Sequence, residues 1–227
     1  EQGRPAGRCD ALASLALEAA RLGADRRDEE LLALAERLAK EARELTELLP
    51  GRPPWRARAD AALARTALAR GAPDVAADAA RSALHELEEI HREDLLLDIV
   101  LPVAAAILAG GSGEEKEAAR ERLRTTAVLI AQRITDETIR VRWFRGPVGR
   151  ELSRLAEPPT TDGAVTDLGD TDALAWLLIA GRTNKEIASK LGVSEDVVVR
   201  RLTEMYAKVG LSSPAEGALF ALREQEA

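Results

Sequence analysis

Basic and polar side chains gather between residues 182 and 208, and their types suit binding to a phosphate backbone. Arginine and lysine neutralise phosphates, and each such contact adds to the affinity for DNA. The candidate DNA-binding residues are Arg182, Thr183, Asn184, Lys185, Val199, Arg200, Arg201 and Lys208. A single surface charge is usually only solvated, so it is the gathering of these residues in one short segment that indicates contact with nucleic acid.

Residues that could do other chemistry are few. His85 and His91 are six positions apart on one expected helix, whereas two metal ligands on a helix face lie about three or four apart. The glycine-rich stretch 110–113 lacks the Lys-Ser/Thr that completes a phosphate-binding loop. Neither paired catalytic acids nor a Ser-His-Asp spacing stands out. We therefore predict no catalytic residue, no metal site and no cofactor, and we do not expect an enzyme.

Two short helices joined by a tight turn are predicted to position the basic residues. Thr183 stands three residues before Glu186, the spacing at which a hydroxyl and a carboxylate cap one another's backbone N–H groups. Gly192 can take a positive φ in the turn, and Ser194 can cap the second helix. The pattern predicts a helix-turn-helix, whose second helix enters a DNA groove.

The second helix, about residues 194–209, is predicted to bury one apolar stripe. The residues of this stripe are Val198, Leu202, Met205 and Val209. At about 100° per residue, the stripe turns Arg200 and Ala207 directly outward, with Asp196 beside them. Arg200 and Val199 would approach the bases in the major groove, while Lys185, Arg201 and Lys208 would hold phosphates.

The composition indicates an all-α protein. Hydrophobic residues make up 46% of the 227 residues but aromatic residues only 3%, and most of the hydrophobic residues are Ala and Leu. Few β-branched runs occur, and 31% of the residues are charged, which favours helices. We expect helices over residues 10–22, 27–49, 55–70, 73–91, 95–109, 114–134 and 136–144, with a last segment to 156 and a further helix through 180.

The order of these helices predicts two domains. Residues 1–157 are expected to form stacked helical hairpins that resemble tetratricopeptide repeats, with an irregular helical bundle as the alternative. Residues 158–168 collect turn formers and are interpreted as a linker. Residues 169–227 are expected to form a four-helix domain, whose last helix begins near Ser213 with Pro at its first position and Glu216 completing the cap.

The segment from Asp170 to Leu222 resembles the C-terminal DNA-binding domain of LuxR/NarL-type transcription regulators. The likeness lies in Gly181, TNKEIASKLGVS, Val198, Met205, Lys208, Val209-Gly210 and Leu211-Ser212-Ser213. Residues 134–152 look like the end of the helical region that precedes this domain in large multidomain actinobacterial regulators. The resemblance implies the C-terminal part of a transcription regulator that binds double-stranded DNA as a dimer.

Four positions depart from the pattern of that family. Asp196 stands where a basic residue is usual, Val197 where Thr is usual, Val199 where a polar or basic residue is common, and Pro214 where Arg is usual. From Asp167 to Ala227 the chain has seven Lys or Arg and ten Asp or Glu. The alternative function is therefore a protein-interaction module that keeps the fold but has lost DNA binding.

The remaining features concern partners and location. We expect a protein partner or a homodimer through the helical domain or the terminal helix. No apolar run is long enough for a membrane span and no signal peptide is apparent, so we expect a cytoplasmic protein without membrane contact. Cys9 is the only cysteine, which excludes an internal disulfide, and we expect it to be a spare thiol near a frayed end over residues 1–8.

Overall fold

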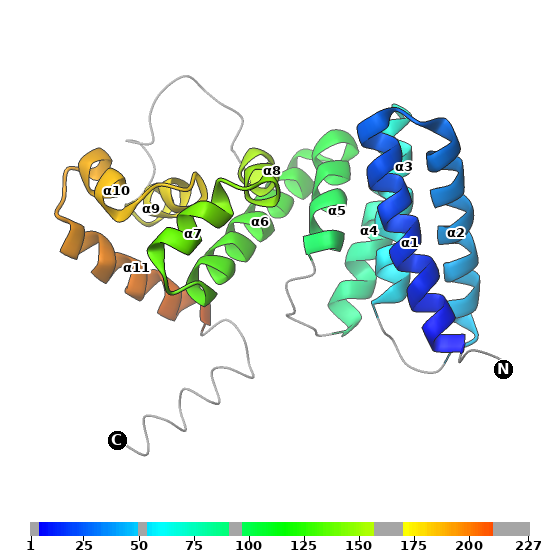
Figure 1. Cartoon of the computed structure of the whole chain (residues 1–227), viewed down its shortest axis with the longest axis horizontal. Helices are drawn as coiled ribbons and strands as arrows, with labels where there is room; N and C mark the ends of the chain where they lie inside the picture. The colour runs from blue at the N-terminus through cyan, green and yellow to red at the C-terminus, as the bar shows by residue number, and fades with distance from the viewer. Residues whose placement is uncertain (1–4, 50–53, 91–96, 157–169, 211–227) are drawn as a thin grey trace, which may run out of the picture. The chain divides into compact units, whose positions relative to one another are not determined.

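A computed structural model describes residues 5–49, 54–90, 97–156 and 170–210 (Figure 1), with side chains left out at 88–90, 170–172 and 208–210. Within these ranges the chain is all-α, as predicted. Its eleven described helices are α1 (Pro5–Arg26), α2 (Glu29–Glu47), α3 (Trp55–Ala69), α4 (Pro73–Ile90), α5 (Leu97–Gly110), α6 (Gly113–Arg133), α7 (Glu137–Phe144), α8 (Pro147–Ala156), α9 (Asp170–Ile179), α10 (Asn184–Leu191) and α11 (Glu195–Gly210).

The chain divides into two compact units, Glu1–Ala119 and Arg120–Ala227. The division falls within α6, so that α7 and α8 belong to the same unit as α9, α10 and α11. The predicted linker at 158–168 and the predicted terminal helix from Ser213 lie outside the described residues. The predicted domain boundaries therefore stay predictions.

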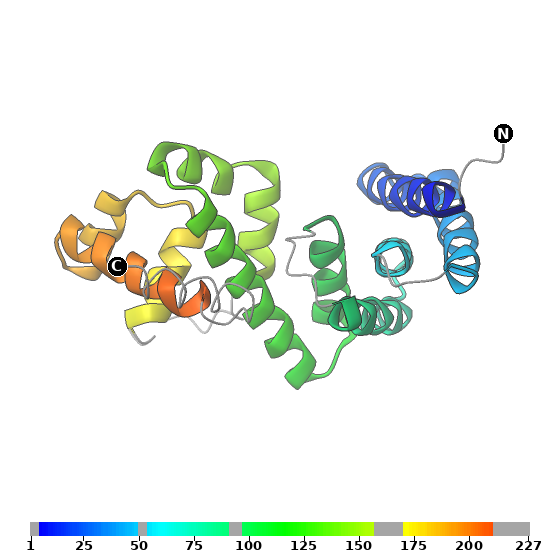
Figure 2. The same cartoon turned by 90° about the horizontal axis from the view of Figure 1, so that it is seen from below.

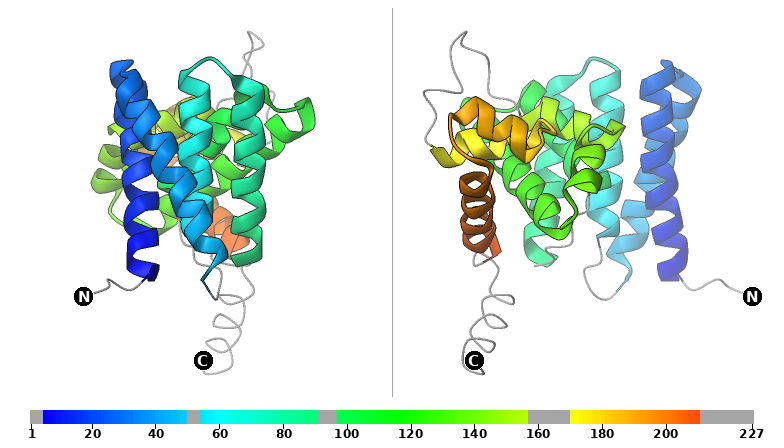
Figure 3. Two further views of the ribbon diagram at one scale, coloured as in Figure 1. Left: turned by 90° about the vertical axis from the view of Figure 1, so that its right-hand side faces the viewer. Right: turned by 60° about the vertical axis from the view of Figure 1, so that its left-hand side comes forward.

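In the first unit each helix packs against its neighbour in sequence, and α1 and α3 also pack against the next helix but one. α1 contacts α2 and α3, α3 contacts α4 and α5, and α4 contacts α5. Figures 1 and 2 show α1 to α5 as neighbouring helices, and the left view of Figure 3 shows α1, α2 and α3 side by side. Eighteen of the 23 buried residues in the core of this unit are Ala, which lets helix backbones approach closely. The tetratricopeptide-like type of stacking stays a prediction.

The first helix differs from its predicted bounds at both ends. It begins at Pro5 rather than near residue 10, and Cys9 is fully buried, its thiol donating to the Ala42 carbonyl at 3.4 Å. The helix also continues through Gly23 to Arg26. The missing side chain of Gly23 makes room for α2, since an added Cβ would lie 2.9 Å from Leu32 Cδ2. The prediction that this helix ends at residue 22 was therefore wrong.

Most other helix ends follow the local signals in the sequence. Asp28 caps α2 by accepting hydrogen bonds from the backbone of Glu30 and Leu31 at 3.0 and 3.1 Å. Ser112 and Glu115 form the reciprocal cap of α6, at 2.7 and 3.3 Å. These caps satisfy N–H groups that a helix start leaves without intrahelical partners.

The second unit is built around larger side chains. Phe144, Leu123 and Leu152 from α6 to α8 are all buried, as are Leu178 of α9 and Ile187 of α10. α8 contacts α7 and α9, and α11 contacts both α9 and α10. α7 and α8 thus belong to the same unit as α10 and α11, which carry most of the candidate DNA-binding residues.

Candidate nucleic-acid interface

The start of α10 has the predicted reciprocal cap. The Thr183 hydroxyl accepts a hydrogen bond from the Glu186 N–H at 3.1 Å, and the Thr183 N–H donates to Glu186 Oε2 at 2.8 Å. This backbone donor holds the pKa of the Glu186 carboxyl below its usual value. The cap confirms the first helix of the predicted pair at the position that the sequence indicates.

The turn between α10 and α11 is also as predicted. Gly192 ends α10 in the left-handed conformation, with φ 66° and ψ 29°, a region where a residue with a Cβ is strained. The Val193 N–H then donates to the Ala188 carbonyl at 3.1 Å. The Ser194 hydroxyl accepts from the Val197 N–H at 3.4 Å, a long bond that confirms the position of the cap.

The second helix, α11, buries the predicted stripe. Val198, Leu202 and Met205 are 0, 4 and 5% exposed, while the side chain of Val209 lies outside the described residues. Arg200 and Ala207 are exposed on the opposite side, as predicted. Packing of the stripe fixes the rotation of α11 and thereby determines which residues face solvent.

The outward face of α11 has few attachments to the rest of the unit. Val199 is 50% exposed. Arg200 approaches Glu204 at 3.9 Å, with both side chains mostly exposed. Such surface pairs contribute only about 0–1 kcal/mol, so that Arg200 can exchange this partner at little cost. The same face also carries exposed Asp196, which disfavours the approach of a phosphate backbone.

The candidate residues on α10 and its approach fall into two groups. Lys185 is exposed and forms no ion pair with any described residue. Arg182 faces Glu186 at 3.7 Å, and Thr183 is engaged in the cap described above. Arg201, on the flank of α11, is partly buried and has a partner within the chain. The side chain of Lys208 is outside the described residues.

Asn184 is held by two residues of α7 that the sequence analysis did not single out. Its backbone N–H and its side-chain amide donate to Glu137 Oε1 and Oε2 at 2.8 and 3.1 Å. Its side-chain carbonyl accepts from Arg140 Nη2 at 2.9 Å. The Glu137 carboxylate thus occupies the N-terminal end of α10, where a helix dipole favours an anion.

Two further residues attach α7 and α8 to the corner between α9 and α10, through three hydrogen bonds. Arg145, which follows α7, donates from Nε to the Gly181 carbonyl at 3.0 Å and from Nη2 to Glu186 at 3.3 Å. The Ser153 hydroxyl on α8 lies 2.6 Å from the Ile179 carbonyl and donates to it. These contacts join residues between 26 and 41 positions apart in sequence, so that no local spacing of residues predicts them.

Arg140, which is 6% exposed, also acts on Tyr206 of α11. Burial raises the pKa of Tyr206, and the positive charge of Arg140 offsets part of that rise. The polar side chains of α7 thus reach the start of α10 and the inner side of α11.

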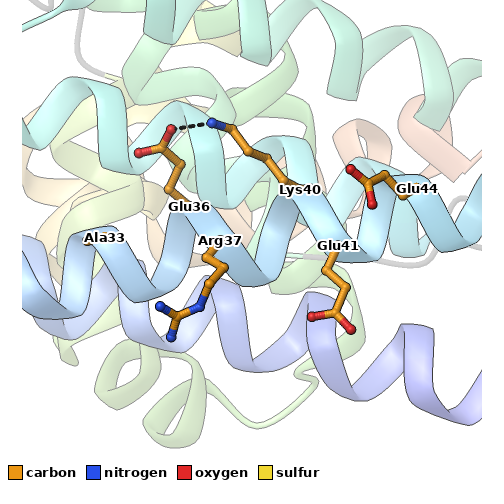
Figure 4. Close-up of a pocket in the computed structure, with 6 residues that line it drawn as sticks. All are labelled: Ala33, Glu36, Arg37, Lys40, Glu41 and Glu44. Carbon is orange, nitrogen blue, oxygen red and sulfur yellow. Dashed lines mark hydrogen bonds and ion pairs between the residues drawn. The ribbon is translucent and has the colours of Figure 1, made fainter.

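Other kinds of site find little support in the described part of the chain. No group of three or more possible metal ligands occurs there, and His91 lies outside it. A shallow hollow runs along one face of α2, lined by Ala33, Glu36, Arg37, Lys40, Glu41 and Glu44 (Figure 4). Glu36 and Lys40 pair across it at 2.6 Å. All these residues come from one helix, and no nucleophile or metal-ligand set converges there.

Comparisons with known proteins add no further information. The chain matched none of the protein-family models, curated proteins or solved structures with which it was compared. Among the described helices, none combines the length and the apolar character needed to cross a membrane.

Proposed function

We propose that α9, α10 and α11 bind double-stranded DNA and that the chain is part of a LuxR/NarL-type transcription regulator. In this proposal α11 enters the major groove, with Arg200 and Val199 toward the bases. Lys185, Arg201 and Lys208 hold phosphates. Arg182, Thr183 and Asn184 position α10, and contact DNA only where their present bonds open. A role on DNA implies a cytoplasmic location.

One observation carries the proposal: the outward face of α11 is presented by a capped helix and a glycine turn, and it has few contacts of its own. The buried stripe from Val198 to Met205 fixes this face. Arg200 reaches from it with 70% of its side chain exposed. A rigid helix with an exposed arginine is what reading of base edges in the major groove requires.

A second candidate function is binding of a protein through the same face. Val199 is an exposed apolar side chain, flanked by Asp196 and by the Arg200–Glu204 pair. A face of mixed charge around an apolar centre suits a protein partner better than a polyanion. The partner, or a second copy of the chain, would then be bound through α11. In the first proposal, by contrast, dimerisation uses the helical unit or the terminal segment.

A salt series of binding to random-sequence duplex DNA distinguishes the two functions. We expect the logarithm of the binding constant to fall with the logarithm of salt concentration, with a slope of about −0.9 per phosphate contact. Lys185→Ala should flatten this slope by about 0.9, and Arg200→Ala should weaken binding to a specific site more than to random DNA.

Arg37→Ala provides the matched control for these variants. Arg37 is an exposed arginine on α2 that forms no ion pair with a described residue, and its removal changes the net charge equally. The salt slope of Arg37→Ala should equal that of the unaltered chain. If the folded chain shows no binding at low salt, the DNA proposal fails and the protein-binding alternative takes its place.

A further inference from the structure

Charge is distributed unevenly along the chain. Residues 1–119 have a net charge of −7, and residues 157–227 have a net charge of −5. Between them, residues 120–156 carry nine basic and four acidic residues, a net charge of +5. All nine basic residues are arginine, whose planar fork binds phosphate oxygens two at a time. The basic part of the chain therefore lies in α6 to α8 and not in α9 to α11.

Some of these nine arginines are engaged inside the protein. Arg140 and Arg145 bind the corner of α9 and α10, as described above. Arg124 pairs with Glu121 at 2.7 Å, and its guanidinium lies 5.8 Å from the centre of the Trp176 ring. Arg120 and Arg122 also have partners within the chain. These five positions are accounted for by the fold.

The other four arginines are exposed and form no ion pair with any described residue. They are Arg133, Arg142, Arg150 and Arg154. An exposed cation without a partner retains its full charge for an outside ligand, apart from screening by salt. Four such arginines in 37 residues set this segment apart from the two acidic segments on either side.

Arg150 and Arg154 occupy one face of α8. They are four positions apart, so that their Cβ atoms lie about 5–6 Å from one another. The opposite face of α8 carries the buried residues Leu152, Leu155 and Ala156. Like charges at this spacing disfavour a helix by about 0.2–0.5 kcal/mol, and no described acid neutralises either one. The proximity of these two charges therefore does not stabilise α8.

α8 is also fixed to the candidate DNA-binding helices. Ser153, between the two arginines in sequence, donates to the Ile179 carbonyl at the end of α9. Arg145 holds the neighbouring Gly181 carbonyl. A ligand bound to the arginine face of α8 is therefore held by the same compact unit that presents α11.

We propose that Arg150 and Arg154 bind the phosphate backbone of duplex DNA, as a second contact surface besides α11. This proposal rests on the proposed function that the chain binds DNA. Charge complementarity selects the occupant, because phosphates follow one another about every 3.4 Å of axis along each strand, so that two arginines one helical turn apart reach neighbouring phosphates. The surface contacts no base edge, so that its contribution is independent of sequence.

The test measures the salt dependence of binding to a random-sequence duplex with the full chain. Arg150→Ala/Arg154→Ala should flatten the logarithmic salt slope by about 1.8, because two phosphate contacts are lost. The matched control is Arg26→Ala/Arg37→Ala, which removes two exposed arginines of the first unit that have no ion pair with a described residue. Its slope should stay that of the unaltered chain.

A conservative variant separates contact from folding. Arg150→Lys/Arg154→Lys keeps both charges and should retain most of the slope, even if the alanine variant loses helical signal. Suppose that the alanine variant keeps its fold and has the same salt slope as the control, while Arg200→Ala weakens binding. The proposed contact surface on α8 is then refuted, and the role of α11 stands. If only the α8 variant weakens binding, the α8 surface stands and the role of α11 is refuted. Absence of DNA binding at low salt refutes both, and leaves an acidic protein as the occupant of α8.

Discussion

The two compact units use opposite packing strategies. The core of the first consists mostly of Ala, whereas the second also buries the large side chains of Phe144, Leu123, Leu152, Leu178 and Ile187. Ala cores allow close helix packing, but leave no room for added atoms. Cores of large side chains instead lose the most when atoms are removed. The difference teaches that truncation of a core side chain should cost more stability in the second unit than in the first.

Polar groups within the two cores differ in the same way. In the first unit Asp60 is fully buried among Ala residues, where it accepts from the Ser82 hydroxyl at 2.6 Å and faces Arg43 at 3.2 Å. In the second unit, the buried Arg140 belongs to the cluster that fixes α7 to α10. Asp60 joins α3 to α2 and α4 within the first unit, whereas Arg140 holds the start of α10 in the second.

Removal of a large side chain from the second unit should have the largest effect. Phe144 is 2% exposed, and Phe144→Ala should lower the free energy of unfolding by about 4 kcal/mol. Ala62→Gly, at a fully buried position of the first unit, should cost only about 1–2 kcal/mol. Urea denaturation followed by helical circular dichroism measures both. If both variants lose the same free energy of unfolding, the two cores do not differ in their sensitivity to the removal of side-chain atoms.

Addition of a single methyl group should have the next largest effect, in the first unit. A Cβ at Gly110 would lie 2.1 Å from the Pro73 carbonyl oxygen, so that α4 and α5 must move apart. Gly110→Ala should lower the melting temperature and cost about 2–3 kcal/mol. Gly113→Ala is the control, since nothing lies within 4 Å of an added Cβ there. An unchanged melting temperature for Gly110→Ala would show that the approach of these helices can relax freely.

Loss of the carboxylate that holds α10 should have a smaller effect. Glu137→Ala leaves the Asn184 N–H and side-chain amide without their partner, at a cost of about 1–2 kcal/mol. Hydrogen exchange at the Asn184 amide should become faster. Glu137→Gln keeps one oxygen acceptor, so its stability and its exchange rate at Asn184 should lie between those of the unaltered chain and of Glu137→Ala. If exchange at Asn184 is unchanged in the alanine variant, α7 does not stabilise the start of α10.

The pH dependence of the first unit should show the smallest effect. Burial raises the pKa of Asp60 above its usual 3.8, despite Ser82 and Arg43, which lower it, and with Glu86 adding to the rise. The folded state therefore binds this proton more tightly than the unfolded state does. The contribution of Asp60 is fully present below the unfolded pKa and is lost as pH rises through the folded pKa.

Asp60→Asn isolates this contribution from that of other carboxyls. Glu115 has its pKa lowered to about 2, chiefly by Arg81, so that its own contribution is lost as pH falls. The contribution of Glu115 is the same in the unaltered chain and in Asp60→Asn, so it cancels in the difference between their stabilities. The stability of the unaltered chain relative to Asp60→Asn should therefore decrease from pH 4 to pH 7 in urea titrations. A constant or rising difference contradicts the raised pKa.

The features that sequence reasoning recovered are local. The caps at Thr183 and Ser194, the turn at Gly192 and the buried stripe of α11 each depend on residues within a few positions of one another. A hydroxyl three residues before a glutamate, or an apolar residue every third or fourth position, is therefore enough to predict them. The outward direction of Arg200 follows from the stripe by geometry alone.

The features that it missed depend on contacts between distant segments. Gly23 carries the same local signal as a helix end, but its role is set by Leu32 across the helix pair. Glu137 and Asn184 are 47 positions apart, and nothing near either residue indicates that they meet. The candidate site was therefore predictable as a list of residues on α10, on the turn before it and on α11, but not as a unit that includes α7 and α8.

The position of α6 across the unit boundary has a practical consequence for dissecting the protein. A recombinant fragment that begins at Arg120 would cut this helix after its seventh residue, Ala119, and remove the Ser112 cap. The truncated end would expose unpaired amides and fray toward Leu123, a core residue of the second unit. Isotope-labelled fragments for spectroscopy should therefore begin at Gly111, so that the whole helix and its cap are retained.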